Sequence, residues 1–250
     1  MDLSGKCALV TGGSRGIGAA TVLLLAECGA DVVLGYHSRA EDAGRVAAQA
    51  RALGVRSAAV AADIATAAGA QALVDAAVRE LGGLDLFVGN AGIWPVDEEP
   101  VSEMGDARWR RTMAQNVDAM FFTSRAAGRV LRDHGRMVLV ASTAGQRGEA
   151  MHADYAASKG AMISFVKSLA VELAPRDITV NSVAPGWVDT EMCVVPFADG
   201  GRDRIAASIP LGRVADPRDI AGPIVFLCST LARHVTGEVL NVNGGSVLCG

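Results

Sequence analysis

The chain has 250 residues, of which 50% are hydrophobic, 20% are charged and 4% are aromatic, and it contains 29 glycines. This length fits one large α/β domain or two small ones, and an apolar content carried by Ala, Val and Leu favours a parallel sheet packed between helices. A formal net charge of −4 without a Lys/Arg-rich run excludes the usual charge pattern of a nucleic-acid-binding protein, although backbone N–H groups can still bind a phosphate-bearing cofactor.

The N-terminus and the cysteines indicate the cellular compartment. Residues 1–6 lead directly into an apolar run without a signal-peptide pattern, and no stretch reaches the roughly 18 apolar residues of a membrane span. The five cysteines are Cys7, Cys28, Cys193, Cys228 and Cys249. They show no CxxC or Cys/His spacing, and an odd number cannot pair completely within one chain. We therefore expect a cytoplasmic protein with reduced thiols, no metal site and no membrane partner.

Short apolar runs alternate with longer helical patterns along the chain. The runs predicted as strands are Cys7–Thr11, Asp31–Gly35, Val55–Ala61, Leu84–Val88, Arg136–Ala141, Ile178–Pro185 and Glu238–Val242. The first two helices are predicted at Gly16–Cys28 and Ala40–Leu53, and each precedes a glycine that can take the left-handed conformation. Strands joined by crossover helices run parallel. The sequence thus predicts a single Rossmann-type, doubly wound α/β domain over residues 1–250, with a parallel sheet of about seven strands and helices on both faces.

One stretch near the C-terminal third, Trp187–Pro210, shows no regular pattern. It contains Pro196, Gly200 and Gly201 beside the apolar segment Val194–Phe197. A loop this long inside a compact domain is commonly a functional lid. We expect residues 187–212, called the lid below, to cover a substrate.

The first predicted strand runs into a glycine-rich turn that precedes the first helix. This turn, Thr11–Gly18, reads TGGSRGIG and places its glycines in a TGxxxGxG spacing at Gly12, Gly16 and Gly18. Such glycines let the backbone turn tightly and approach a pyrophosphate, which then lies at the positive end of the helix. The pattern predicts a dinucleotide site, and a purely structural strand-to-helix turn is the alternative.

With this spacing the chain resembles the short-chain dehydrogenase/reductase family, in particular its branch of 3-oxoacyl-(acyl-carrier-protein) reductases. The resemblance recurs in order along nearly the whole chain, at Asn90-Ala91-Gly92, Asn116, Ser142–Gly145, Tyr155–Lys159, Pro185-Gly186 and Thr190. One position departs from the pattern, because many relatives have two asparagines before Ala-Gly, whereas this chain has Gly89 before Asn90. We expect this change to alter packing beneath the cofactor.

Two side chains point to proton transfer. Tyr155 and Lys159 are four residues apart in a helical stretch, so that their side chains share one face of the helix. A phenol is poorly suited to acid–base chemistry near neutral pH, and a neighbouring ammonium lowers its pKa. We therefore expect Lys159 to lower the pKa of Tyr155, which can then exchange a proton with a substrate.

The resemblance implies further catalytic roles. Ser142 and Tyr155 would bind the substrate oxygen, and Tyr155 would protonate it as hydride arrives from the nicotinamide. Lys159 would also bind the nicotinamide ribose, and Asn116, in the helix before the fifth strand, would anchor a water that links Lys159 to solvent. Taken singly, each of these residues has an ordinary structural explanation, such as a cap or a solvated surface residue.

The choice of nicotinamide depends on the end of the second strand. NAD-selective sites usually carry an acid about 20 residues past the glycines, whereas Gly35–Arg39 contains no carboxylate. Arg15 with Arg39 or His37 offers charge-assisted bonds to a 2′-phosphate. NADP(H) is therefore favoured, and NAD(H) remains possible if Arg39 is a solvated loop residue. The predicted cofactor-binding residues are Gly12, Ser14, Arg15, Gly16, Ile17, Gly18, His37, Ser38, Arg39, Asp63, Ile64, Asn90, Ala91, Gly92, Tyr155, Lys159, Pro185, Gly186, Val188 and Thr190.

The substrate is less constrained than the cofactor. The resemblance implies an oxidoreductase that acts on a carbonyl or secondary alcohol, with a 3-oxoacyl thioester or similar ketone as the expected substrate. The substrate contacts are expected at Ser142, Trp94, Gln146, Met151 and Trp187, by their positions beside the motifs. His152 is either a further substrate contact or a surface residue at the start of a helix.

The sequence also leaves other functions and several assemblies open. A non-catalytic NAD(P)-binding regulator and an NAD-dependent alcohol, sugar or steroid dehydrogenase remain alternatives, and the presence of Tyr155 and Lys159 argues against the regulator. A serine hydrolase is disfavoured because residues 141–145 lack the first glycine of GxSxG. The apolar end of Asn243–Gly250 resembles C-termini that pack across subunits. A homotetramer is expected by analogy, with a homodimer as the alternative, and an acyl carrier protein is a partner that the sequence leaves open.

Overall fold

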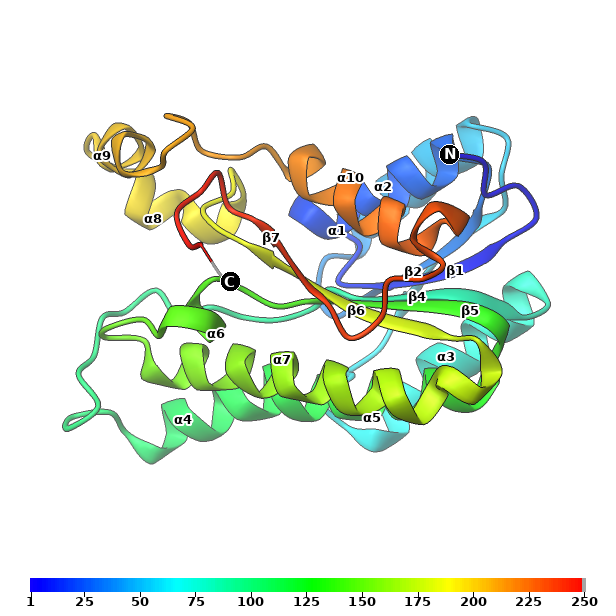
Figure 1. Ribbon diagram of the computed structural model, residues 1–250, viewed down its shortest axis with the longest axis horizontal. Coiled ribbons are helices and arrows are strands. Elements are labelled where there is room, and N and C mark those ends of the chain that lie inside the picture. Colours follow the sequence, from blue (N-terminus) through cyan, green and yellow to red (C-terminus); the bar gives the residue numbers. More distant parts are fainter. Residues whose placement is uncertain (249–250) are drawn as a thin grey trace.

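A parallel β-sheet of seven strands forms the centre of the computed structural model, which describes residues 1–248 (Figure 1). The strands are β1 (Cys7–Thr11), β2 (Asp31–Tyr36), β3 (Ser57–Ala61), β4 (Leu84–Gly89), β5 (Leu131–Val140), β6 (Thr179–Pro185) and β7 (Val239–Val242). Their order across the sheet is β3-β2-β1-β4-β5-β6-β7. The predicted Rossmann-type, doubly wound domain is confirmed.

Helices cover both faces of this sheet. The helices are α1 (Gly16–Glu27), α2 (Ala40–Ala52), α3 (Ala67–Leu81), α4 (Asp106–Met113), the π-helical turn η1 (Ala114–Asp118), α5 (Ala119–Val130), α6 (Ala144–Arg147), α7 (Ala153–Leu173), η2 (Ala174–Arg176), η3 (Glu191–Cys193), α8 (Val194–Phe197), α9 (Gly201–Ser208), α10 (Pro217–Cys228) and η4 (Thr230–Ala232). Figure 1 shows α1, α2 and α10 on one face and α3, α5 and α7 on the other. Each face buries its own apolar cluster, so the sheet is covered on both sides.

The residue pattern explains why these segments adopt their structures. β1, β4 and β6 are buried at every position, as expected for apolar strands in a sheet that is covered on both faces. After α1 and α2 the chain turns at Gly29 and Gly54, with φ of 89° and 92°, the left-handed conformation that the sequence predicted. Asp216 begins α10 in a capping box with Asp219, and Pro217 occupies the first helical turn.

Two expectations about the secondary structure were wrong, beyond differences of one or two residues at the ends of other elements. β5 begins at Leu131 and not at Arg136, because Leu131 pairs with Leu84 before an irregularity in the register. The sequence did not predict this start, because residues 132–135 are polar and show no strand periodicity. The lid is not an irregular loop, because it contains η3, α8 and α9. These are short helices of three, four and eight residues, too short for their periodicity to be recognised in the sequence.

The sheet topology fixes where a ligand can enter. After β3 the chain crosses to the other side of β1, so that β4 lies next to β1. The connection after β1 leads to β2 on one side, and the connection after β4 leads to β5 on the other side. In open α/β sheets the crevice at such a switch point, beyond the carboxyl ends of the strands, is the usual ligand site. The segments that meet there are the glycine turn after β1 and residues 90–93 after β4.

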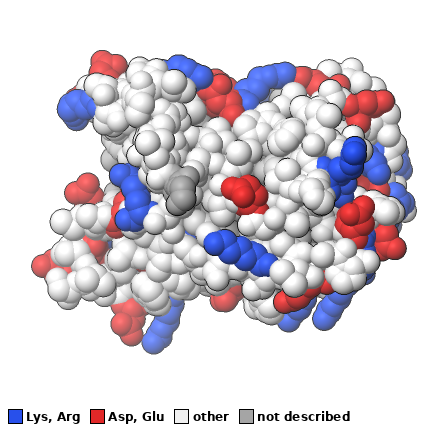
Figure 2. All heavy atoms as spheres, viewed as in Figure 1, with Lys and Arg blue, Asp and Glu red and all other residues white. Residues whose placement is uncertain are grey.

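The surface carries both signs of charge. On the face shown in Figure 2, Lys and Arg lie beside Asp and Glu, and uncharged residues separate these groups. In residues 1–248 no helix is both long enough and apolar enough to cross a membrane. The same residues contain no group of three His, Cys, Asp or Glu side chains placed to hold a metal ion.

Candidate active site

The glycine turn after β1 is shaped by close backbone contacts. Gly12 and Gly16 have φ of 64° and 53°, a region that side chains other than glycine rarely adopt. Gly18 lies so close to Gly12 that a Cβ placed on it would be 2.1 Å from the Gly12 carbonyl oxygen. Glycine at these positions is therefore a steric requirement of the turn.

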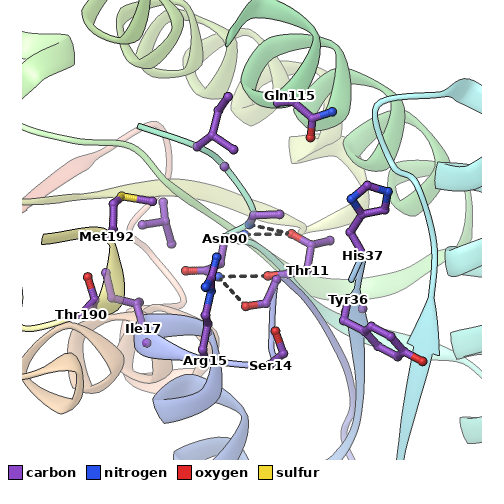
Figure 3. Close-up of a pocket in the computed structure, with 18 of the residues that line it drawn as sticks. Thr11, Ser14, Arg15, Ile17, Tyr36, His37, Asn90, Gln115, Thr190 and Met192 are labelled. Carbon is purple, nitrogen blue, oxygen red and sulfur yellow. Dashed lines mark hydrogen bonds between the residues drawn. The ribbon is translucent and has the colours of Figure 1, made fainter. Parts of the chain in front are cut away.

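Asn90 links this turn to the end of β4. Its Nδ2 donates to the carbonyl oxygens of Thr11 and Gly12 at 3.0 and 3.2 Å, and its backbone N–H donates to Thr11 Oγ1 at 3.0 Å (Figure 3). The preceding Gly89 departs from the family pattern for a visible reason. A Cβ at Gly89 would lie 2.5 Å from Leu139 Cδ2, so the Leu139 side chain fills the space that an asparagine would need.

A cavity of about 370 Å³ opens where these segments meet. All the residues that the sequence predicted to bind the cofactor line it. Within the described part of the chain no side chain caps the N-terminus of α1. Its first N–H groups thus suit an anion, which commonly binds at a helix N-terminus. The tight glycine turn and this uncapped helix end together fit a dinucleotide.

Basic side chains lie at one end of the cavity. Arg15 follows the first glycines, and His37 and Arg39 follow β2, all three exposed and lining the same space. Figure 3 shows Arg15 and His37 reaching from these two segments. The segment His37–Arg39 contains no carboxylate, and the guanidinium groups of Arg15 and Arg39 suit an anionic group. In this structure both of them contact the Glu191 carboxylate, which also lines the cavity.

Tyr155 and Ser142 meet on the cavity wall from α7 and from the end of β5. Burial of its hydroxyl among protein atoms raises the pKa of Tyr155 above its usual value of 10. A hydrogen bond with Ser142 opposes this shift, and the charges of Glu149 and Cys193 add to it. The expectation of a lowered pKa for Tyr155 is wrong for the structure, in which the pKa is raised because desolvation dominates. The phenol is therefore held in its protonated form.

Lys159 is almost fully buried one helical turn from Tyr155. Its Nζ donates to the Val140 carbonyl oxygen at 2.8 Å and lies 5.8 Å from the centre of the Tyr155 ring. Burial lowers the pKa of Lys159 from 10.5 to about 8. The ammonium thus bonds the end of β5 and lies along the face of the phenol ring.

Asn116 lies in the π-helical turn η1, behind the cavity wall. Its side chain accepts from the Ile93 N–H at 2.7 Å and donates to the Ile93 carbonyl oxygen and Ser158 Oγ at 2.9 and 3.0 Å. It does not line the cavity. These bonds fix the loop after β4 against α7, and the predicted water relay through Asn116 stays a prediction.

The burial of Lys159 predicts a stability cost that pH can reveal. A pKa of about 8 in the folded chain, against an ordinary 10.5, means that folding disfavours the charged form. Each difference of one in pKa corresponds to about 1.4 kcal/mol, and losing the bond to Val140 offsets about 1 kcal/mol of the gain from removing the charge. We expect Lys159→Met to raise the free energy of unfolding at pH 7 by about 2–3 kcal/mol, measured by urea unfolding.

The pH dependence gives this prediction its sign. Between pH 8 and 10.5 the unfolded chain holds more protons at Lys159 than the folded chain, so wild-type stability rises with pH and approaches that of the variant. Lys167→Met, at an exposed position on the same helix, is the control and should change stability by less than about 0.5 kcal/mol. A Lys159→Met protein that is less stable than the wild type at pH 7 would contradict the prediction.

Aromatic side chains connect the start of α7 to the lid. Trp94 stacks on His152 with ring centroids 4.6 Å apart, and it meets Trp187 edge-on at 6.2 Å. Trp187 in turn contacts Phe197 of α8 at 6.0 Å. His152 is only 4% exposed, so its interpretation as a surface residue is wrong, because stacking on Trp94 buries it. Half-buried Glu149 adjoins this aromatic cluster, and its charge adds to the raised pKa of Tyr155. Burial also raises the pKa of Glu149 itself.

Four of the five predicted substrate residues do not line this cavity, and two of them make contacts elsewhere. Gln146 donates to Asn241 Oδ1 of β7 at 2.7 Å, so it links α6 to the edge of the sheet. Met151 is 44% exposed, while its carbonyl oxygen accepts from the Glu99 N–H at 3.1 Å and from Arg108. Neither lines the cavity, nor do Trp94 and Trp187, whereas Ser142 does.

The cavity also includes residues that the sequence reasoning did not select. These are Thr11, Gly35, Tyr36, Ala62, Leu73, Ile93, Gln115, Val140, Ala141, Glu191, Met192 and Cys193. Several directly adjoin predicted positions, so extending each motif by one residue would have found them. Glu191 also adjoins a predicted position, Thr190, but its contacts with two arginines far away in the sequence give no local signal.

Comparison with known proteins agrees with this geometry. A family model described as enoyl-(acyl carrier protein) reductase matches residues 12–246. The chain is 40% identical to the 3-oxoacyl-(acyl-carrier-protein) reductase FabG of Vibrio cholerae and 38% identical to the L-rhamnose 1-dehydrogenase (NAD(P)(+)) of Azotobacter vinelandii, in each case over 98% of both chains. A crystal structure of a short-chain dehydrogenase from Burkholderia cenocepacia in complex with NADP superposes with a TM-score of 0.93 at 38% identity, covering 98% of this chain and 99% of that one.

Proposed function

Because this chain belongs to the short-chain dehydrogenase/reductase family of NAD(P)-dependent oxidoreductases, we propose that it moves hydride between NADP(H) and the carbonyl of a 3-oxoacyl thioester or a similar ketone. The observation that carries the proposal is the position of Tyr155 beside Ser142 on the cavity wall. Both side chains line the cavity that the glycine turn borders, and burial raises the pKa of Tyr155, so the phenol is protonated at neutral pH.

The side chains divide the work of carbonyl reduction as follows. A bound nicotinamide supplies hydride. Ser142 and Tyr155 donate hydrogen bonds to the carbonyl oxygen, and Tyr155 transfers its proton to that oxygen as negative charge develops there. Lys159 places a cation beside the resulting phenolate and stabilises it until the proton is replaced. Burial raises the pKa of Tyr155 and so makes the phenol a weaker acid, and proton transfer therefore depends on the negative charge that develops on the carbonyl oxygen.

A screen of carbonyl substrates tests the proposal. Purified protein should consume NADPH, followed by absorbance, with 3-oxoacyl thioesters, and a panel of quinones, ketosteroids and sugars measures its selectivity. NADPH binding without turnover of any carbonyl would instead favour a non-catalytic dinucleotide-binding regulator.

Cofactor preference rests on the basic end of the cavity. Arg15 and Arg39 support a preference for NADP(H), because guanidinium groups bond phosphate oxygens with charge assistance. We expect Arg39→Ala to weaken NADPH binding by about tenfold, the value of one charged hydrogen bond, and to leave NADH binding within about twofold. Fluorescence titration with each cofactor measures both numbers. Equal losses for NADPH and NADH would contradict the assignment of Arg39 to the 2′-phosphate.

A sugar substrate is the second candidate. The Glu149 carboxylate lies near Trp94 and Tyr155, and a half-buried carboxylate suits the hydroxyl groups of a sugar better than an acyl chain. The similarity to an L-rhamnose 1-dehydrogenase supports a sugar as the second candidate substrate. Reduction of NAD(P)⁺ by aldoses, without turnover of thioesters, would favour it.

We further propose a cytoplasmic protein that forms a homotetramer. Free thiols at Cys7, Cys28, Cys193 and Cys228 support a reducing compartment, and Cys249 lies outside the described residues. Exposed apolar side chains on α4, α5 and α7, namely Trp109, Phe121 and Val171, support an assembly of subunits. A homodimer is the alternative, and light scattering that shows a monomer would contradict both.

A further inference from the structure

One carboxylate ties the lid to the basic end of the cavity. Glu191, in η3, accepts from Arg15 Nη1 at 2.5 Å and from Arg39 Nη2 at 3.1 Å. These arginines lie 176 and 152 residues away in the sequence, so the contact is a product of the fold. All three side chains line the cavity. Glu191 therefore contacts the same guanidinium groups that support binding of a 2′-phosphate.

The lid is anchored by backbone hydrogen bonds close to this contact. Val188 and Ala215 form a parallel bridge at its base, where the Asp189 N–H donates to the Ala215 carbonyl oxygen at 2.9 Å and the Ala215 N–H donates to that of Trp187 at 3.1 Å. The lid is thus closed at its base, and η3, α8 and α9 extend beyond this bridge. Glu191 follows this base by two residues, so its contacts join the start of the lid to Arg15 and Arg39.

The charges do not allow Glu191 and a phosphate to use both arginines together. A carboxylate and a phosphate both require the N–H groups of a guanidinium, and like charges at such distances repel. The Arg15, Arg39 and Glu191 side chains are about half exposed, at 51%, 51% and 53%, and an exposed ion pair is weak. A doubly charged phosphate with three acceptor oxygens is the stronger partner. Arg39 also pairs with Asp42, at 3.8 Å.

We propose that Glu191 is a latch that competes with the 2′-phosphate for Arg15 and Arg39, so that NADP(H), unlike NAD(H), frees the lid as it binds. The inference rests on the proposed assignment of the two arginines to the 2′-phosphate. Glu191 would then restrain the preference for NADP(H) and couple the adenosine end of the cofactor site to the segment that covers the substrate.

Titration calorimetry with adenosine 2′,5′-bisphosphate and adenosine 5′-monophosphate tests the competition. Glu191→Gln keeps the shape of the side chain and removes its charge. It should tighten binding of the bisphosphate by about two- to fivefold, the worth of exposed ion pairs, and leave the monophosphate unchanged. Asp203→Asn is the matched control, because it removes one charge from exposed α9 without touching either arginine, and it should change neither affinity.

Amide hydrogen exchange tests the coupling to the lid. In the wild type, the bisphosphate should speed exchange in η3, α8 and α9, because it releases Glu191. In Glu191→Gln these amides should already exchange faster, and the bisphosphate should add no further increase.

The outcomes separate this inference from the proposed function. If Arg39→Ala leaves the affinity for the bisphosphate unchanged, both the arginine assignment and the latch are wrong. If Arg39→Ala weakens that binding but Glu191→Gln leaves it unchanged or weaker, the assignment stands and the latch is overturned. Lid exchange that is the same in wild type and Glu191→Gln also overturns it. Tighter bisphosphate binding together with a faster-exchanging lid supports it.

Discussion

Replacing Tyr155 with Phe should lower kcat for carbonyl reduction by about 10²–10⁴-fold, the usual contribution of a positioned general acid. Phenylalanine keeps the ring against Lys159 and removes the proton that the carbonyl oxygen would receive. Because the phenol acts on the developing charge, KM should change far less than kcat. Steady-state rates of NADPH oxidation measure both constants.

The control for this variant separates chemistry from folding. Tyr155→Phe should bind NADPH within about twofold of the wild type and unfold at a similar urea concentration, because no charge is lost and the ring volume is kept. Ser168→Ala, at an exposed position on the same helix α7, should leave kcat unchanged. A Tyr155→Phe protein as active as the parent would show that Tyr155 is not the acid.

Replacing Gly18 with Ala should weaken NADPH binding by at least about tenfold and destabilise the fold by about 1–3 kcal/mol, the usual cost of overpacking. The added methyl group would lie 2.1 Å from the Gly12 carbonyl oxygen and 2.6 Å from Asn90 Nδ2. The first contact is with backbone, so relief requires the turn that borders the cavity to move. Fluorescence titration with NADPH and urea unfolding measure the two effects.

Gly44→Ala is the matched control for Gly18→Ala. Gly44 is exposed within α2, and a Cβ placed there would meet nothing within 4 Å. The same substitution should therefore stabilise the chain by about 0.5–1 kcal/mol, because alanine loses less backbone entropy in a helix than glycine, and NADPH binding should be unchanged. Equal NADPH affinity in Gly18→Ala and the wild type would argue against the steric role of Gly18.

Much of the architecture could be predicted because its causes are local. Both ends of β1 were predicted correctly, because a short apolar run bounded by polar residues marks where a buried strand begins and ends. The left-handed turns at Gly29 and Gly54 follow from the absence of a side chain at each position. The spacing of Gly12, Gly16 and Gly18 likewise reflects contacts within one turn. Each of these signals acts over a few residues and can therefore be read in a single stretch of sequence.

Other properties of the site depend on residues that only the fold brings together. The position of Gln146 against Asn241 and the burial of His152 under Trp94 join segments with no shared periodicity. The short lid helices take their shape from packing and not from a repeating pattern. For this reason the substrate side of the cavity was predicted less accurately than the cofactor side.

By itself, the sequence determined the order of strands and helices, the glycine turn and the pairing of Tyr155 with Lys159 on one helix face, because backbone sterics and helical periodicity act between near neighbours. The tertiary structure alone decided that Tyr155 holds its proton more tightly than a free phenol and that Glu191 meets Arg15 and Arg39. Desolvation and long-range ion pairs depend on every atom around a group, and those atoms come from segments far apart in the chain.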